Sequence, residues 1–312
     1  MKINLEKYAL ENGQITFKKS DDGRKLRTAF WKAKKKKAHG TVFFLNGHRE
    51  FIEKYSETFG FLVEKGFNVI TLDWRGWGLS DRPFPSRPKV QHIFSASEYQ
   101  LDLDSVIDLA KEKNLTTPWH LVAHSLGCLL GLRRLVLEPE CFSKYIFLSP
   151  LWGNVRSIPK PIQRLLVRYE KALEFLWLTR ITNQNPKKYQ PYPLTVDFKE
   201  NTLTSDEKQF YRLQMLLKEN TGLHSGAPTL GYLIAILKEI NELNLTNLPN
   251  RKILVLLAEH ERITDNNAVI AFIKKHHFIN VEKIEKAQHE ILIEKEALRT
   301  EALSIMHSFL KA

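Results

Sequence analysis

Short apolar segments alternate with helix-length segments along much of this 312-residue chain, and this alternation constrains its fold more than any other feature. The apolar segments are 41–45 (TVFFL), 69–73 (VITLD), 120–123 (HLVA), 145–149 (YIFLS) and 253–258 (ILVLLA). Strands that are apolar on both faces are typical of a parallel sheet that helices cover on both sides. We therefore predict an α/β fold, with a mostly parallel sheet flanked by helices.

The intervening segments carry helical signals. Apolar residues recur at helical spacing in 53–65 and 98–113, and Gly66 is a typical residue for the end of the first helix. Upstream, polarity alternates in 15–36 around an Asp-Gly pair at 22–23, which is a hairpin signal. We expect this hairpin to add antiparallel strands at the edge of the sheet.

The pattern changes between the fourth and the fifth apolar segments. Helical spacing covers 152–177 and 205–223, and several prolines in 183–198 indicate irregular structure. Because ligands bind beyond the carboxyl ends of parallel strands, we interpret this region as a mostly helical cap over that end of the sheet. The predicted division is a core formed by 1–152 and 246–312, and an inserted cap formed by 153–245.

The chain is basic, since 47 lysines and arginines against 35 acidic residues give a formal net charge of +12. A basic surface attracts anionic partners, among them acidic membranes. No zinc-finger spacing, RNA-recognition signature or continuous basic helix accompanies the charge, so the sequence does not predict nucleic-acid binding. Peripheral contact with an anionic membrane and the oligomeric state both stay open.

The composition also bears on location. Two cysteines are too few for a disulfide framework. No apolar run approaches the roughly 18 residues of a membrane span, and the opening segment MKINLEKYALENG is too polar for a signal peptide. We expect a cytoplasmic protein, with attachment to the inner face of the membrane as an alternative.

The segment 123–127 (AHSLG) lies directly after a predicted strand and before a helical pattern. It is the G-x-S-x-G nucleophile elbow with alanine in the first position. Small residues two before and two after the serine let the strand turn sharply into the helix, which exposes the hydroxyl of Ser125. The sequence thus predicts Ser125 as a catalytic nucleophile.

A serine hydroxyl needs a base, and the base needs an acid that orients it. In the elbow fold the chain order is serine, acid, histidine. His289 follows the last strand-like segment, so it is the expected base. The loop after 253–258 offers Glu261 at the expected acid position, with Asp265 as an alternative acid.

Backbone N–H groups must also face the oxyanion of the tetrahedral intermediate. We expect one donor to be Leu126 and the other to be His48, in the loop after the first strand of the parallel set. Trp152, at the start of the cap, is a candidate for the substrate pocket. No spacing typical of a nucleotide, metal or cofactor site is present, so we expect none.

Seven segments resemble the α/β-hydrolases of the bacterial lysophospholipase and monoacylglycerol lipase type. They are 46–55 (NGHREFIEKY), 66–82 (GFNVITLDWRGWGLSDR), 123–127 (AHSLG), 148–153 (LSPLWG), 201–210 (NTLTSDEKQF), 225–233 (SGAPTLGYL) and 288–292 (QHEIL). The resemblance spans nearly the whole chain, the cap included. It implies Ser125 as nucleophile, His289 as base and Glu261 at the position where relatives carry aspartate.

Together these features predict a serine hydrolase that cleaves carboxylic esters through an acyl-enzyme intermediate. The resemblance implies lysophospholipids or monoacylglycerols as substrates. A small-ester carboxylesterase and a serine aminopeptidase are alternatives, since one fold hosts many substrates. A non-catalytic protein that binds a membrane surface and keeps the elbow as a relic is an alternative of another class.

Overall fold

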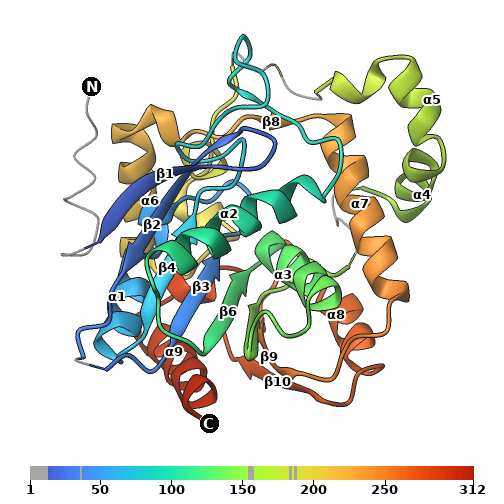
Figure 1. Ribbon diagram of the computed structural model, residues 1–312. Helices are drawn as coiled ribbons and strands as arrows, with labels where there is room; N and C mark the ends of the chain where they lie inside the picture. Colours follow the sequence, from blue (N-terminus) through green and yellow to red (C-terminus); the bar gives the residue numbers. More distant parts are fainter. Residues whose placement is uncertain (1–12, 36, 154–157, 183–184, 186–187) are drawn as a thin grey trace.

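The computed structural model describes residues 13–35, 37–153, 158–182, 185 and 188–312, and within them an eight-stranded sheet has the order β1-β2-β4-β3-β6-β7-β9-β10 (Figure 1). Its strands are β1 (Gln14–Lys19), β2 (Lys25–Trp31), β3 (Thr41–Leu45), β4 (Asn68–Leu72), β6 (Trp119–His124), β7 (Lys144–Leu148), β9 (Lys252–Ala258) and β10 (Ile279–Ile284). Parts of the predicted core 1–152, hairpin 15–36, helical segment 152–177 and irregular segment 183–198 lie outside the described residues.

The predicted mostly parallel sheet is confirmed. β1 and β2 pair antiparallel through a turn in which Gly23 has a φ of 83°, and β2 also runs antiparallel to β4. The pairs from β4 across to β10 are all parallel. The carboxyl ends of these six strands therefore meet at one edge of the sheet, where the loops carrying the candidate site residues begin.

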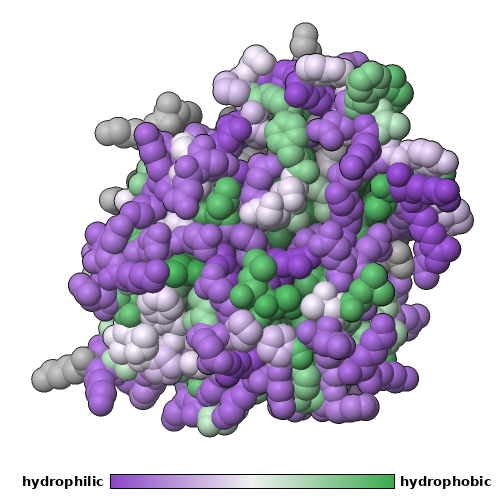
Figure 2. Space-filling view, turned by 45° about the vertical axis from the view of Figure 1, so that its right-hand side comes forward, coloured by the Kyte–Doolittle hydropathy of each residue, from purple (hydrophilic) through white to green (hydrophobic). Residues whose placement is uncertain are grey.

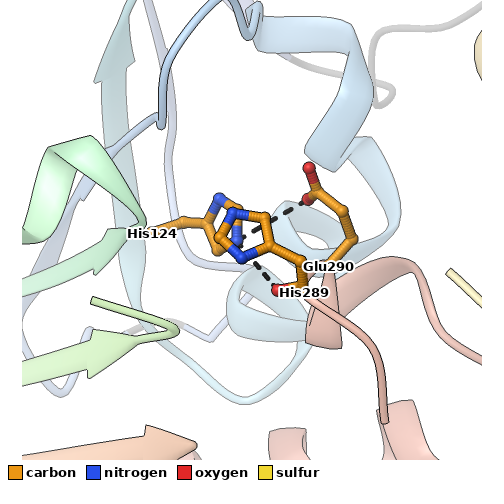
Figure 3. Close-up of side chains that lie close together, drawn as sticks. All are labelled: His124, His289 and Glu290. Carbon is orange, nitrogen blue, oxygen red and sulfur yellow. Dashed lines mark hydrogen bonds and ion pairs between the residues drawn. The ribbon is translucent and has the colours of Figure 1, made fainter. Parts of the chain in front are cut away.

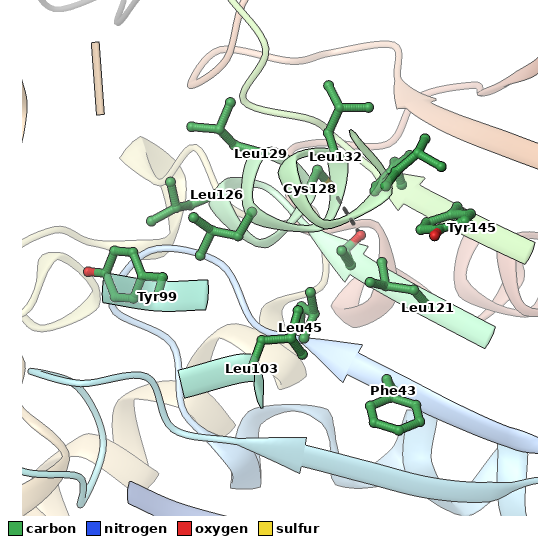
Figure 4. Close-up of a cluster of buried hydrophobic side chains, with 14 of the residues drawn as sticks. Phe43, Leu45, Tyr99, Leu103, Leu121, Leu126, Cys128, Leu129, Leu132 and Tyr145 are labelled. Carbon is green, nitrogen blue, oxygen red and sulfur yellow. Dashed lines mark hydrogen bonds between the residues drawn. The ribbon is translucent and has the colours of Figure 1, made fainter. Parts of the chain in front are cut away.

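Helices cover both faces of the sheet. They are α1 (Ser56–Glu64), α2 (Glu98–Glu112), α3 (Leu126–Leu137), α8 (Asn266–Ile273) and α9 (Glu296–Lys311). Alternate side chains of β3 enter two separate buried clusters: Phe43 and Leu45 pack with α2, α3 and α8, and Val42 and Phe44 pack with α1 and α9. Figure 4 shows part of the first cluster, with Leu45 near Leu103 of α2. The continuous apolar character of the strands thus follows from burial on both sides.

The predicted helix 53–65 is divided in the structure. A 3-10 helix, η2 (Ile52–Tyr55), precedes α1, and Gly66 follows the helix with a φ of 93°. Glu53 is buried and faces Arg27, whose guanidinium donates to both carboxylate oxygens at 2.8 Å. Arg27 also donates to Asp73 at 2.7 Å. This ion-pair group ties β2, the end of β4 and η2 together, and so anchors the loop after β3.

The segment between β7 and β9 carries four described α-helices and several 3-10 helices. They are α4 (Lys160–Arg168), α5 (Glu170–Phe175), η3 (Leu178–Arg180), η4 (Tyr192–Leu194), η5 (Phe198–Glu200), α6 (Glu207–Glu219), η6 (Thr221–Leu223) and α7 (Leu230–Leu245). A short strand, β8 (Ala227–Pro228), pairs with β5 (Val90–Gln91), which the helical pattern did not predict. The helix α7 packs on α3, while α4 and α5 lie at the periphery (Figure 1). The boundaries of the cap stay a prediction.

Candidate active site

Ser125 lies at the sharp turn between β6 and α3. Its φ of 51° and ψ of −114° are strained values for a residue with a side chain. Three backbone hydrogen bonds hold the turn: Ser125 N–H donates to the carbonyl of Leu148 at 2.9 Å, and the N–H groups of Cys128 and Leu151 donate to Ser125 O at 3.1 Å. The surrounding backbone thus fixes the strained conformation that an elbow requires.

The second small residue of the elbow is needed for close packing. A Cβ atom on Gly127 would lie 2.3 Å from the carbonyl oxygen of Leu45 and 2.7 Å from that of Asn46, both in the backbone after β3. The first small position is filled by Ala123, which is fully buried. The start of α3 therefore packs directly against the end of β3, which places the loop after β3 beside the elbow.

His289 and Glu261 come together in the structure. His289 Nδ1 donates to Glu261 Oε2 at 2.7 Å, and both side chains are buried. Glu261 Oε1 accepts from the backbone N–H groups of Ile263 at 2.7 Å and Thr264 at 3.0 Å. Burial alone would raise the pKa of Glu261, but the hydrogen bond and charge of His289 outweigh it and lower the pKa to about 2. Glu261 is therefore an anion.

Asp265, the alternative acid, has a different partner. It is the N-cap residue of α8, and its carboxylate accepts from Ala268 N–H at 3.2 Å. Glu261 reaches His289 from a position four residues earlier, directly after β9. The structure thus brings Glu261, rather than Asp265, to the imidazole.

His289 lies beside the elbow. Its carbonyl accepts from Ser149 Oγ at 2.8 Å, and its ring centre is 4.8 Å from that of His124, the residue before the serine. Within the described residues, no hydrogen bond joins Ser125 Oγ to His289. Such bonds are often long in ligand-free structures and shorten when substrate binds.

The loop after β3 brings His48 to the same edge of the sheet. Its Nδ1 lies 2.7 Å from the hydroxyl of Tyr232 in α7, and its ring packs edge-on against Trp77. Burial lowers the pKa of His48 well below its ordinary value, so the ring is neutral. In the described chain His48 N–H donates to no other residue. Leu126 is the first residue of α3, where N–H groups have no partner within the helix.

Trp152 is packed into the hydrophobic core. It is 1% exposed, and its ring centre lies 5.1 Å from that of Phe147 and 5.2 Å from that of Phe272. These contacts account for its burial between β7 and α8. Its place in a substrate pocket stays a prediction.

Sequence reasoning assigned no role to a buried charged cluster beneath the site. It contains Glu50, Lys54, Tyr55, His124 and Glu290. Lys54 Nζ lies 2.8 Å from Glu50 Oε1 and 2.6 Å from Glu290 Oε1. Tyr55 donates its hydroxyl proton to Glu50 Oε2 at 2.7 Å. One sequence feature could have indicated the cluster. All five residues belong to three of the segments that carry the family resemblance, NGHREFIEKY, AHSLG and QHEIL.

Both ring nitrogens of His124 face acceptors. Nδ1 lies 2.8 Å from Glu50 Oε1. Nε2 lies 3.2 Å from the carbonyl oxygen of His289, as Figure 3 shows. Burial opposes the charged ring, but the carboxylates of Glu50 and Glu290 outweigh it and raise the pKa of His124. A protonated ring donates both bonds. The cluster then holds two cations and two anions and is neutral as a whole.

His124, His289 and Glu290 also present ligand atoms within 4.8 Å of one another, as a metal site would. Their other contacts fit a hydrogen-bonded cluster better. Lys54 already supplies a cation to Glu290, and His124 Nδ1 is engaged by Glu50. A metal ion at this place would have to displace these partners.

Comparison with known proteins identifies the family. Residues 36–296 match the sequence family described as serine aminopeptidase, S33. The chain belongs to this family. It is an α/β-hydrolase of the lysophospholipase and monoacylglycerol lipase type, as the resemblance implies.

Curated relatives of this hydrolase include two bacterial proteins. One is the probable lysophospholipase L2 of Haemophilus influenzae, 26% identical over 277 residues, which cover 86% of this chain and 83% of the relative. The other is lysophospholipase L2 of Escherichia coli, 25% identical over 285 residues, which cover 86% and 79%. Relatives named in this way identify the chain as an ester-hydrolysing enzyme.

Solved structures share the fold at low identity. A soluble variant of monoglyceride lipase from Saccharomyces cerevisiae has a TM-score of 0.74 at 17% identity, and the match covers 97% of this chain and 96% of that one. Monoacylglycerol lipase of Paleococcus ferrophilus has a TM-score of 0.70 at 18% identity, with 92% and 98% covered. These likenesses extend through the region between β7 and β9.

Proposed function

We propose that this hydrolase cleaves carboxylic esters with Ser125 as nucleophile, His289 as general base and Glu261 as the acid that orients the base. The observation that carries the proposal is the 2.7 Å bond from His289 Nδ1 to Glu261. An anionic Glu261 fixes the tautomer of His289 in which Nε2 is free to accept a proton. The strained turn at Ser125 supports the role of its hydroxyl.

The reaction follows from these positions. His289 Nε2 takes the proton of Ser125 as Oγ attacks the ester carbonyl, and Glu261 stabilises the resulting imidazolium. The imidazolium returns the proton to the leaving alcohol, which leaves the acyl group on Ser125. His289 then takes a proton from water as its oxygen attacks the acyl carbonyl. The imidazolium returns that proton to Ser125 Oγ as the bond to the acyl group breaks, and the carboxylic acid leaves.

The tetrahedral intermediate carries its negative charge on the former carbonyl oxygen. We assign the N–H groups of His48 and Leu126 as its donors. The hydrogen bond between the ring of His48 and Tyr232 holds this loop in place, and burial, which lowers the pKa of His48, makes the ring a weaker base. Removal of one such donor costs about 10²–10³-fold in rate in other serine hydrolases.

For the substrate, we propose lysophospholipids or monoacylglycerols. The names of the bacterial relatives support the first, and the fold shared with monoglyceride lipases supports the second. The family description leaves a serine aminopeptidase as the second candidate. Esters and amides of matched size therefore have to be compared directly.

We further propose that the segment α4–α5 contacts an anionic membrane, from which such substrates are taken. Its exposed apolar side chains are Ile162, Leu165, Tyr169, Phe175, Leu176, Trp177 and Ile181. Arginines and lysines are interleaved with them along 160–180. α4 and α5 lie at the upper right of Figure 1, and Figure 2, in which that side is turned forward by 45°, shows hydrophobic side chains among hydrophilic ones in its upper part. This combination is typical of segments that lie in a membrane interface.

No helix in the described residues is both long and apolar enough to cross a bilayer. The cytoplasmic location stays a prediction.

Labelling with a fluorophosphonate probe tests the nucleophile. We expect the wild-type protein to be labelled and Ser125→Ala to be unlabelled and inactive, with its thermal unfolding unchanged. Ser143→Ala is the control, because it removes an exposed hydroxyl that precedes β7, at the edge of the sheet opposite the site. Labelling that persists in Ser125→Ala would contradict the proposal.

A substrate panel tests the reaction class. It contains decanoyl lysophosphatidylcholine, monodecanoylglycerol, p-nitrophenyl butyrate and aminoacyl p-nitroanilides. Higher kcat/KM for the two lipid esters than for the other compounds supports lipid hydrolysis. Preference for the anilides would instead support the aminopeptidase.

Vesicle sedimentation tests the membrane surface. We expect binding to vesicles with anionic lipid, weaker binding at high salt, and a loss of binding in Phe175→Ser/Trp177→Ser. Leu245→Ser is the matched control, because Leu245 is 88% exposed and lies outside this segment. Equal binding by both variants would refute the assignment of the surface.

A further inference from the structure

A pocket lies beside the loop after β3. It has a volume of about 440 Å³ and is lined by Arg49, Asn185, Lys188, Tyr189, Gln190, Tyr192 and Thr195. The charged side chains among these lining residues, Arg49 and Lys188, are both cations. The remaining lining residues offer hydroxyl and amide groups. The chemistry of the lining therefore suits an anion that accepts several hydrogen bonds.

Arg49 is half-buried and has no counter-ion among the described residues. In the described chain its guanidinium forms no ion pair or hydrogen bond, and its Nε is buried without a partner. Its guanidinium carbon lies 4.9 Å from the centre of the ring of Tyr189. Burial lowers the pKa of Arg49. A guanidinium that faces a pocket without a counter-ion can donate charge-assisted hydrogen bonds to an anionic ligand there.

The buried arginines of the protein have the carboxylate partners that Arg49 lacks among the described residues. Arg27 pairs with two carboxylates, Arg75 with three, and Arg134 with two. These pairs satisfy charges within the folded chain. Arg49 differs in facing a pocket that is open to solvent.

The position of Arg49 connects this pocket to the reaction. It directly follows His48, whose N–H is a proposed oxyanion donor, and its φ of 63° departs from the backbone values that arginine prefers. In a lysophospholipid, six single bonds separate the scissile carbonyl carbon from the phosphorus. Since three bonds of an extended chain span about 3.8 Å, six span roughly 7 Å. That is the order of length of an extended arginine side chain.

We propose that Arg49 and Lys188 bind the phosphodiester of the substrate headgroup and thereby favour lysophospholipids over monoacylglycerols. This inference rests on the proposed ester hydrolysis at Ser125. A guanidinium matches two phosphate oxygens at once, and an ammonium adds a third donor. A monoacylglycerol offers hydroxyl groups but no anion that would pair with either cation.

The first experiment compares decanoyl lysophosphatidylcholine with monodecanoylglycerol. This phospholipid has no net charge, so attraction between a charged aggregate and the basic protein does not affect the comparison. We expect Arg49→Gln to lower the ratio of the two kcat/KM values by about 10- to 100-fold, since a hydrogen bond to a charged group is lost. Arg49→Lys recovers part of the ratio. Lys188→Gln lowers it in the same direction and leaves the oxyanion loop intact.

Lys275→Gln is the matched control, because it removes an exposed charge outside the pocket and keeps the wild-type ratio. A ratio that stays at the wild-type value in both Arg49→Gln and Lys188→Gln would overturn the inference. So would an equal fall in kcat/KM for the two substrates, which would show damage to the catalytic loop instead of loss of a headgroup contact.

Calorimetry with the Ser125→Ala protein separates this inference from the proposed function and identifies the source of the anion. We expect glycerophosphocholine to bind at least tenfold more weakly when Arg49→Gln is added. If inorganic phosphate binds and glycerophosphocholine does not, the headgroup assignment is overturned. If the wild-type protein hydrolyses neither lipid, the proposed function fails, and this binding measurement still decides whether the pocket takes a phosphodiester.

Discussion

Replacement of Lys54 with methionine is expected to destabilise the fold by about 3–5 kcal/mol, the cost of leaving a buried ion without its partner. Lys54 is 4% exposed, and its ammonium lies within 2.8 Å of a carboxylate oxygen of Glu50 and of one of Glu290. Methionine keeps much of the apolar stem. The two carboxylates then face one cation, the ring of His124.

The loss of folding stability in Lys54→Met is expected to depend on pH, and the charges of the cluster determine in which direction. In the wild-type protein burial raises the pKa of Glu50, but His124 and Lys54 outweigh burial and hold the pKa well below its ordinary value. Without Lys54, a carboxyl of the cluster acquires a folded-state pKa above the roughly 4.3 of an unfolded glutamate. Because of such a group, the folded protein loses stability as the pH rises from the unfolded-state pKa to the folded-state pKa. The variant is therefore expected to differ most from wild type at high pH.

Urea denaturation at about pH 5 and about pH 8, followed by circular dichroism, measures both effects. Lys111→Met is the matched control, because Lys111 is 62% exposed and such changes stay within about 0.5 kcal/mol. Addition of Glu50→Gln to Lys54→Met restores neutrality, so the double variant should be more stable than additivity of the single changes predicts. A loss below about 1 kcal/mol at pH 8, or one that does not change with pH, would refute the reasoning.

Two further predictions follow from the site. Glu261→Gln should lower kcat by about 10³–10⁴-fold, as loss of the acid does in other triads. Asp265→Asn should weaken the N-cap of α8 and keep kcat within about fivefold. Equal kinetics of the two variants would be inconsistent with Glu261 as the acid. Gly127→Ala should cost about 1–3 kcal/mol in unfolding experiments, because its Cβ would meet the backbone carbonyl of Leu45 at 2.3 Å. Gly131→Ala, in the same helix, would meet the flexible side chain of Leu121 instead, so it should cost less.

The sheet could be predicted because each of its strands carries its own local signal. The apolar segment TVFFL is β3 to the residue, since both faces of this strand are buried. The Asp-Gly pair at 22–23 places a turn through backbone preference alone. By contrast, β5 and β8 are two-residue strands that pair across 137 positions of sequence, and a contact of that kind leaves no periodicity to read.

Individual site residues could be proposed from chain order and from motifs, whereas their partners could not. The loop after β9 contains several acids, and local sequence does not say which of them faces His289. The structure separates them by backbone geometry, since Asp265 caps α8 while Glu261 follows β9 directly. Likewise, the lack of a counter-ion for Arg49 among the described residues becomes visible only in the folded chain.

The buried cluster gives a physical reason for a histidine beside Ser125, the proposed nucleophile. His124 reaches Glu50, which accepts the N–H of Gly47 in the oxyanion loop, and it also reaches the carbonyl of His289. One ring thus joins the elbow, the loop after β3 and the loop that carries His289. Because a buried cation must keep its acceptors, movement of any one loop would leave a charge unsatisfied. The cluster therefore holds three segments distant in sequence in the mutual positions that the proposed reaction requires.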